Sequence, residues 1–253
     1  MIHLFASDYD GTLYHDGKIS KGNLEAIEAF RKLGHKFGII TGRSINSILD
    51  EVNEHKIPFD FISGINGGVV LDHNLKEIQI HKMNEDVVMD VLKTIDSFGV
   101  RLYGLNDGYD HITVQYHDIL NKVHIESFDR IYDNGITGMY VGCHTNEDAL
   151  KVYAMINTKY ADDDIKSYAN ESYVDVATIF NSKATGVEVI MDHYDITGSA
   201  YTVGDSYNDV PMLRDFNGFL MGNGVTSLAK FASAGVVDTV QQAITLAIQD
   251  IEG

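Results

Sequence analysis

Residues 2–13 read IHLFASDYDGTL, and this stretch decides how the rest of the chain is interpreted. Its apolar half predicts a short buried strand. Asp8 and Asp10 follow at the end of that strand, and open parallel sheets bind their ligands at the carboxyl ends of strands. Because side chains alternate along an extended segment, we expect both carboxylates to point to the same side. Gly11 then allows the chain to turn away sharply.

Two other interpretations of this acidic stretch need to be considered. A calcium loop of the EF-hand type also begins Asp-x-Asp, but it needs glycine at its sixth position and glutamate at its twelfth. Counted from Asp8, these positions hold Leu13 and Ile19, which excludes such a loop. A purely structural acidic turn after a strand stays open from this motif alone.

The composition limits the partners of the chain. Its 253 residues suffice for one large domain or two modest ones. With 19 basic and 37 acidic residues, the formal charge is −18. This argues against nucleic acid or an acidic membrane as a partner, because binding by counterion release needs clustered Lys and Arg. A phosphate ester would have to be bound locally, by a metal and a few placed donors.

Other features of the sequence indicate a cytoplasmic protein without a membrane partner. Cys143 is the single cysteine, so no intrachain disulfide is possible and a buried structural thiol is expected. The first residues lack the basic region of a signal peptide, and no apolar run is long enough to span a bilayer. The oligomeric state is left open.

Strands and helices alternate in the first and last parts of the chain, which predicts parallel βαβ units. The fold class expected is therefore α/β, with a Rossmann-like doubly wound parallel-sheet core. In the first part we predict helix 22–33, strand 37–40, helix 45–54 and strand 59–65. In the last part we predict a helix starting near Lys183, strands 201–203 and 219–221, and helix 239–251.

The rhythm changes in the middle of the chain, where helices are followed by paired strands. This order predicts an α+β layer with an antiparallel sheet. We assign residues 82–181 to an inserted α+β cap domain, and residues 1–81 and 182–253 to the core. The elements expected in the cap are helix 84–98, strands 101–105, 111–116 and 136–143, helix 146–160 and a hairpin over 168–176. From the second helix we expect Ala149, Leu150, Tyr153 and Ala154 to face inward.

Polar side chains follow several of the expected core strands. Besides Asp8 and Asp10, Thr41 and Gly42 follow the second strand, and Asp205 follows strand 201–203. Carboxylates such as Asp8 and Asp205 are hard ligands that suit Mg²⁺. Close carboxylates repel one another, so a cation between them is nearly required if all stay ionised.

The remaining polar groups suit an anion. Lys183 comes at the start of a helix, where free N–H groups and the helix dipole favour negative charge. Thr41 and Asn208 add neutral donors. Together with the acidic pair, this set predicts a site for a dianionic phosphoryl group bound to Mg²⁺. Asp8 would attack phosphorus, and Asp10 would move the protons, a role that typically contributes about 10²–10⁴-fold in rate.

Four motifs carry a resemblance to a known family: DYDGTL at 8–13, TGR at 41–43, Lys183, and GDSYNDVPML at 204–213. In this order they resemble the motifs of the haloacid dehalogenase (HAD) superfamily. The cap between the second and third motifs is similar to that of the Cof-type, subfamily IIB, sugar phosphatases. Two departures stand out. Tyr9 occupies a position where an aliphatic residue or Met is common, and residues 238–240 lack an acidic-Gly-Val signature.

The resemblance implies a role for each matching residue. Asp8 would be the nucleophile and a Mg²⁺ ligand, and Asp10 the acid/base that also lends its backbone carbonyl to the metal. Asp205 would be a further metal ligand, with Asp209 close behind it. The groups expected to hold phosphate are Thr41, Gly42, Lys183 and Asn208, and those expected near the substrate are Arg43 and Asn66.

Several alternatives remain open at this stage. The function expected is a Mg²⁺-dependent phosphatase of a small phosphorylated metabolite. A phosphomutase of the same superfamily and a non-catalytic phosphometabolite-binding protein are the others. Among single residues, Lys183 could be a solvated lysine at a helix start, and Asp209 could cap a helix. Arg43 could pair with a carboxylate instead of touching the substrate.

Overall fold

The structure is a computed structural model that describes residues 1–98, 100–115 and 134–253. The chain divides into two compact units. The first consists of Met1–Arg43, Ile48–Gln79 and Ser182–Gly253, and the second of Ile80–Asn181 together with Ser44–Ser47. The assignment of 82–181 as a cap domain stays a prediction.

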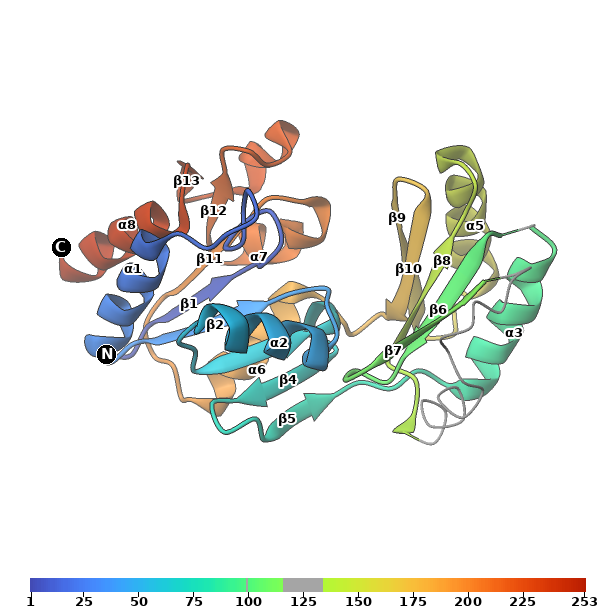
Figure 1. Ribbon diagram of the computed structural model, residues 1–253, viewed down its shortest axis with the longest axis horizontal. Helices are drawn as coiled ribbons and strands as arrows, with labels where there is room; N and C mark the ends of the chain where they lie inside the picture. Colours follow the sequence, from blue (N-terminus) through green and yellow to red (C-terminus); the bar gives the residue numbers. More distant parts are fainter. Residues whose placement is uncertain (99, 116–133) are drawn as a thin grey trace. The chain divides into compact units, whose positions relative to one another are not determined.

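The first unit is built on an eight-stranded sheet in the order β13-β12-β11-β1-β2-β3-β4-β5 (Figure 1). Strand β1 (Leu4–Ser7) lies between β2 (Lys36–Ile40) and β11 (Ala200–Gly204) and runs parallel to both. Strand β4 pairs antiparallel with its neighbour β3. The other strands are β3 (Phe61–Gly64), β4 (Val69–Asp72), β5 (Glu77–Ile80), β12 (Asn217–Met221) and β13 (Gly235–Val237).

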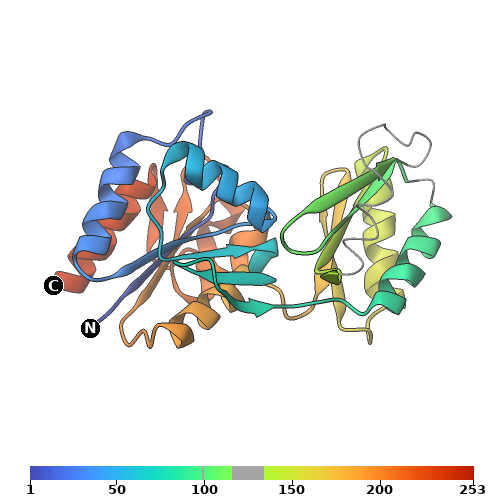
Figure 2. The ribbon, with the colours of Figure 1, turned by 60° about the horizontal axis from the view of Figure 1, so that its bottom comes forward.

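Helices cover both faces of this sheet (Figures 1 and 2). Leu4 and Ala6 of β1 point to one face, where they join a core cluster that includes Val187 of α6. Phe5, which lies between them, points to the other face and packs edge-on against Phe30 of α1. The helices are α1 (Lys21–Lys32), α2 (Ile45–His55), α6 (Lys183–His193), α7 (Val210–Asp215) and α8 (Val240–Glu252). The predicted doubly wound α/β fold class is confirmed.

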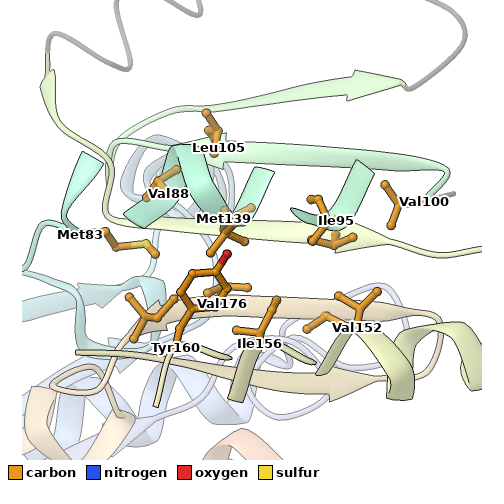
Figure 3. Packing of buried hydrophobic residues seen from close by; sticks show 14 of the residues in the cluster. Met83, Val88, Ile95, Val100, Leu105, Met139, Val152, Ile156, Tyr160 and Val176 are labelled. Carbon is orange, nitrogen blue, oxygen red and sulfur yellow. The ribbon is translucent and has the colours of Figure 1, made fainter. Parts of the chain in front are cut away.

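The second unit contains a five-stranded antiparallel sheet in the order β7-β6-β8-β10-β9, together with helices α3 and α5. Val88 and Ile95 of α3, Val152 of α5 and Met139 of the sheet share one buried cluster (Figure 3), which also holds Cys143. The elements are α3 (Glu85–Asp96), β6 (Leu102–Asn106), β7 (His111–Gln115), β8 (Gly138–Gly142), α5 (Asn146–Lys159), β9 (Ile165–Asn170) and β10 (Tyr173–Thr178). The last residue of predicted strand 111–116 lies outside the described residues.

The inward face predicted for the second cap helix is confirmed at Ala149 but wrong at Leu150, Tyr153 and Ala154, which are exposed. Ala149, Val152 and Ile156 of α5 are fully buried, whereas Leu150 is 58% exposed and Tyr153 38% exposed. The buried stripe follows the spacing i, i+3 and i+7, and successive helical residues are rotated by about 100°. Leu150 therefore lies one step off the stripe. Its hydrophobicity made it look like a core residue, but tertiary packing selected the neighbouring positions.

The burial of Ile156 and the exposure of Leu150 predict that substitutions at these two positions of α5 differ in their effect on stability. Ile156→Ala removes a fully buried side chain from the core of the second unit, so we expect it to lower the free energy of unfolding by roughly 2–5 kcal/mol. Leu150→Ala should change it by less than about 0.5 kcal/mol, because Leu150 is exposed. Urea unfolding of both variants checks the contrast, and equal losses would restore the original assignment of the helix face.

Candidate active site

A buried lysine joins two distant parts of the chain at the carboxyl end of β1. Lys183 is the first residue of α6, and its Nζ lies 2.6 Å from Asp8 Oδ1 and 2.5 Å from Asp209 Oδ1. Its side chain is only 1% exposed. Lys21 also opens a helix after a serine cap, yet its side chain is 88% exposed. Lys183 is therefore not a solvated helix-start lysine, and it bridges two buried carboxylates.

Asp209 uses both of its carboxylate oxygens within this site. Oδ1 accepts from Lys183, and Oδ2 accepts from the backbone N–H groups of Asp205 and Ser206, both at 2.9 Å. The residue lies in the short 3₁₀ turn Tyr207–Asp209 that follows β11, and it is fully buried. Asp209 thus holds the β11 loop in shape and ties it to the start of α6.

Asp205 is oriented by the loop after β1. Its Oδ1 accepts a hydrogen bond from Thr12 Oγ1 at 2.9 Å. Gly11 has a φ of +80°, and a Cβ at this position would lie 2.7 Å from Asp205 Oδ2. Only glycine combines this left-handed backbone with so close an approach. Asn223 completes the loop by donating to the Gly11 carbonyl oxygen at 2.8 Å.

The cluster carries more negative than positive charge. Ligand oxygens of Asp8, Asp205 and Asp209 all lie within 4.8 Å of one another. Lys183 contributes positive charge to this cluster through its contacts with Asp8 and Asp209. Burial raises the pKa of Asp8 well above its usual value, although the attraction of Lys183 opposes this. Burial also raises the pKa of Asp205, against the hydrogen bond from Thr12. The hard oxygen ligands and the unbalanced charge fit a divalent cation.

The ammonium group of Lys183 stays charged in this setting. Burial alone would favour its neutral form, but the attraction of Asp209 and Asp8 outweighs burial and raises the pKa of Lys183. A buried cation fixed in this way is a fitting partner for an anion that approaches Asp8.

Asp10 has different surroundings from Asp8. Its side chain is 53% exposed, and both of its carboxylate oxygens accept hydrogen bonds from Arg43. The Nε–Oδ2 distance is 2.8 Å and the Nη2–Oδ1 distance is 2.7 Å. Of the two roles left open for Arg43, the structure therefore has it paired with a carboxylate.

A second set of polar residues follows strands β2, β3 and β11. Thr41 is buried, and its Oγ1 accepts from the backbone N–H of Arg43 at 3.1 Å. Asn208 donates through Nδ2 to Asn66 Oδ1 at 3.1 Å. A Cβ at Gly42 would lie 3.4 Å from the same Asn66 oxygen, so these residues gather at one edge of the sheet.

The backbone just before Asn66 is strained, at Ile65. Ile65 and Asn66 have φ values of 51° and 52°, and such a conformation is rare for a β-branched residue. Two backbone hydrogen bonds hold it, from Ile65 N–H to Arg43 O at 3.0 Å and from Asn66 N–H to Thr41 O at 2.9 Å. Backbone strain of this kind collects at functional sites.

Sequence reasoning assigned no role to Glu51 or Asn223, which both contact this region. Asn223 comes soon after strand 219–221, and its position beyond a parallel strand is a signal that would have singled it out. Glu51 lies inside α2, where no spacing or motif distinguishes it from the other acidic residues of that helix.

Comparison with known proteins agrees with the fold and with the family that the sequence resembles. A family model described as haloacid dehalogenase-like hydrolase matches residues 5–248. The chain is similar to a phosphatase of the HAD enzyme superfamily from Bacteroides thetaiotaomicron, with 22% identity, coverage of 99% of this chain and 95% of that chain, and a TM-score of 0.80. It is also similar to a HAD subclass IIB sugar phosphatase, with 22% identity, coverage of 100% and 99%, and a TM-score of 0.74.

A third solved structure is similar over nearly its full length. It is a haloacid dehalogenase-like hydrolase from Bacteroides thetaiotaomicron, with 19% identity, coverage of 97% of this chain and 99% of that chain, and a TM-score of 0.77. No curated protein matches the sequence. In the described part of the chain, no helix has the length and apolar character needed to cross a membrane.

Proposed function

The chain belongs to the haloacid dehalogenase-like hydrolase family, and we propose that it is a Mg²⁺-dependent phosphatase of a small phosphorylated metabolite. The observation that carries this proposal is the buried Lys183 between Asp8 and Asp209, with Asp205 beside them. A phosphoryl dianion requires a nucleophile, a compensating cation and fixed positive charge. The likeness to a subclass IIB sugar phosphatase supports a sugar phosphate as the substrate class.

Asp8 and Asp205 are the side chains that would hold the metal, with the backbone carbonyl of Asp10. Thr12 orients Asp205 for this role. Asp209 belongs to the same carboxylate cluster, but because both its oxygens are engaged it acts mainly by orienting Lys183 and the β11 loop. Bound Mg²⁺ supplies charge that offsets the repulsion between the Asp8 carboxylate and the phosphate.

The reaction proceeds in two steps on Asp8. In the first, an Asp8 oxygen forms a bond to phosphorus, the bond from phosphorus to the leaving oxygen breaks, and Asp10 gives that oxygen a proton. In the second, water attacks the phosphorus of the aspartyl-phosphate while Asp10 takes its proton. The bond between phosphorus and Asp8 then breaks, which releases phosphate, restores the Asp8 carboxylate and leaves Asp10 protonated for the next cycle.

The phosphate is held by fixed donors at the sheet edge. Lys183 provides the positive charge, and Thr41, Gly42 and Asn208 provide neutral hydrogen-bond donors. Asn66 receives a hydrogen bond from Asn208 and so orients it next to the substrate.

The proposal is tested by release of inorganic phosphate from an aryl phosphate and a panel of sugar phosphates. We expect turnover with Mg²⁺ and its loss in the presence of a chelator. Isomerisation of a hexose phosphate without net phosphate release would show a phosphomutase instead. Mg²⁺-dependent binding without turnover across the panel would show a non-catalytic binding protein.

Thr12 offers a test of the metal assignment. Thr12→Val keeps the shape of the side chain but removes the hydrogen bond to Asp205, so we expect the Mg²⁺ concentration for half-maximal activity to rise about 10–100-fold. Thr12→Ser keeps the hydroxyl and should stay close to wild type. The rate at saturating Mg²⁺ should change little. If the rate of Thr12→Val fell by the same factor at every Mg²⁺ concentration, Thr12 would not act by orienting Asp205 toward the metal.

A further inference from the structure

Asp10 is held at the end of a chain of polar contacts that runs away from the metal site. Its carboxylate accepts two parallel hydrogen bonds from Arg43, through Nε and Nη2. Such a bidentate pair fixes the plane of a carboxylate as well as its position. Arg43 is itself a long side chain, and holding it in one rotamer costs conformational entropy. A partner for its third nitrogen, Nη1, would help to keep the side chain in place.

Glu51 is that partner. Arg43 donates through Nη1 to Glu51 Oε1 at 2.6 Å. Tyr9 donates its hydroxyl to the other oxygen, Glu51 Oε2, at 2.7 Å. The Tyr9 side chain is fully buried, and the Arg43 guanidinium lies 5.0 Å from the centre of its ring. His55 Nε2 lies 3.5 Å from Glu51 Oε2, one helical turn further along α2.

Charges of opposite sign alternate along this series of contacts, which stabilises it. The hydrogen bond from Tyr9 lowers the pKa of Glu51, and Arg43 adds to this effect while burial opposes it. Glu51 therefore stays ionised. Arg43 lies between two carboxylates, and its hydrogen bond to Asp10 raises its pKa. A buried tyrosine thus anchors a carboxylate, which anchors a guanidinium, which orients Asp10.

We propose that Glu51, anchored by Tyr9, is a positioning residue that fixes the Asp10 carboxylate through Arg43. This inference rests on the proposed function, because it gives Asp10 the role of the acid/base. The inference also gives a reason for tyrosine at position 9. Its hydroxyl donates to Glu51, and an aliphatic residue at this position could not make that hydrogen bond. Glu51 does not contact the substrate.

A leaving-group comparison separates this role from a merely structural one. Phenol has a pKa near 10, as tyrosine has, so phenyl phosphate needs a proton from Asp10 as its bond breaks. The more acidic p-nitrophenol leaves with far less help. For Glu51→Ala we expect kcat/KM to fall by about tenfold or more on phenyl phosphate, and by less than about threefold on p-nitrophenyl phosphate.

Matched variants complete the experiment. Glu51→Gln keeps one carbonyl oxygen that can accept from Arg43, while its NH2 group can donate to the Tyr9 hydroxyl oxygen, so it should restore part of the loss on phenyl phosphate. Tyr9→Phe keeps the ring and should show the same selectivity with a smaller loss. Glu54→Ala removes an exposed acid from the same helix and should leave both rates unchanged.

The possible outcomes are distinct. If Glu51→Ala loses kcat/KM equally on the two esters, or loses none on either, Glu51 does not position Asp10. The proposed function still holds in that case, provided that the wild-type protein hydrolyses the esters. A larger loss on p-nitrophenyl phosphate overturns the positioning role as well. A wild-type protein that hydrolyses neither ester refutes the proposed function itself, and the inference then falls with it.

Discussion

Asp8→Asn is expected to reduce phosphatase activity by at least about 10³-fold. The amide has no negative charge to direct at phosphorus, and it cannot form the aspartyl-phosphate. The amide also replaces the charged oxygen of a proposed metal ligand with a neutral one. Initial rates of phosphate release from p-nitrophenyl phosphate in saturating Mg²⁺ measure the effect.

The variant should remain folded, because the amide still accepts a hydrogen bond from Lys183 and reduces the repulsion among the clustered carboxylates. Asp16→Asn is the matched control. Asp16 belongs to the same segment of chain after β1, but its side chain is 78% exposed, and the substitution should leave the rate near wild type. If Asp8→Asn lost less than about tenfold, Asp8 would not be the nucleophile.

Lys183→Met is expected to be the most destabilising substitution in the site. It leaves Asp8 and Asp209 buried without their shared cation, and breaking a buried ion pair by removing one partner typically costs about 3–5 kcal/mol. Activity should fall as well, because the fixed positive charge for the phosphate is gone. Urea unfolding in the presence of a chelator measures the loss of stability without a contribution from Mg²⁺.

Lys21→Met provides a closely matched control, since Lys21 opens α1 as Lys183 opens α6. Its side chain is solvated, so its removal should change stability by less than about 0.5 kcal/mol. Adding Asp209→Asn to Lys183→Met should recover part of the loss, because one uncompensated charge is removed. Identical unfolding curves for Lys183→Met and wild type would mean that the two carboxylates do not depend on this lysine.

The architecture could be predicted because it follows from patterns along the chain. Alternating apolar strands and amphipathic helices predicted the parallel sheet, and the rule that ligands bind at the carboxyl ends of strands pointed to Asp8 and Asp205. The short strand β13 (Gly235–Val237) was not predicted, since three residues carry too little periodicity to be distinguished from a loop.

The partners of individual side chains were harder to predict. Local sequence showed that Lys183 opens a helix, but not that its ammonium is enclosed by two carboxylates, because that depends on how α6 packs on the sheet. The same holds for Glu51, whose contacts with Tyr9 and Arg43 come from tertiary packing. In α5, hydrophobicity alone placed Leu150 inside, and packing placed it outside.

The position of β1 between β2 and β11 also determines when the sheet around Asp8 can form during synthesis of the protein. Leu4 is in register with Ala200, so the strand that carries the proposed nucleophile gains one of its two neighbours only when β11 has left the ribosome. Pairings between such distant segments form slowly, because the loop between them must close first. A nascent chain that has not yet reached Lys183 therefore holds Asp8 without the lysine and the carboxylates that surround it in the folded protein.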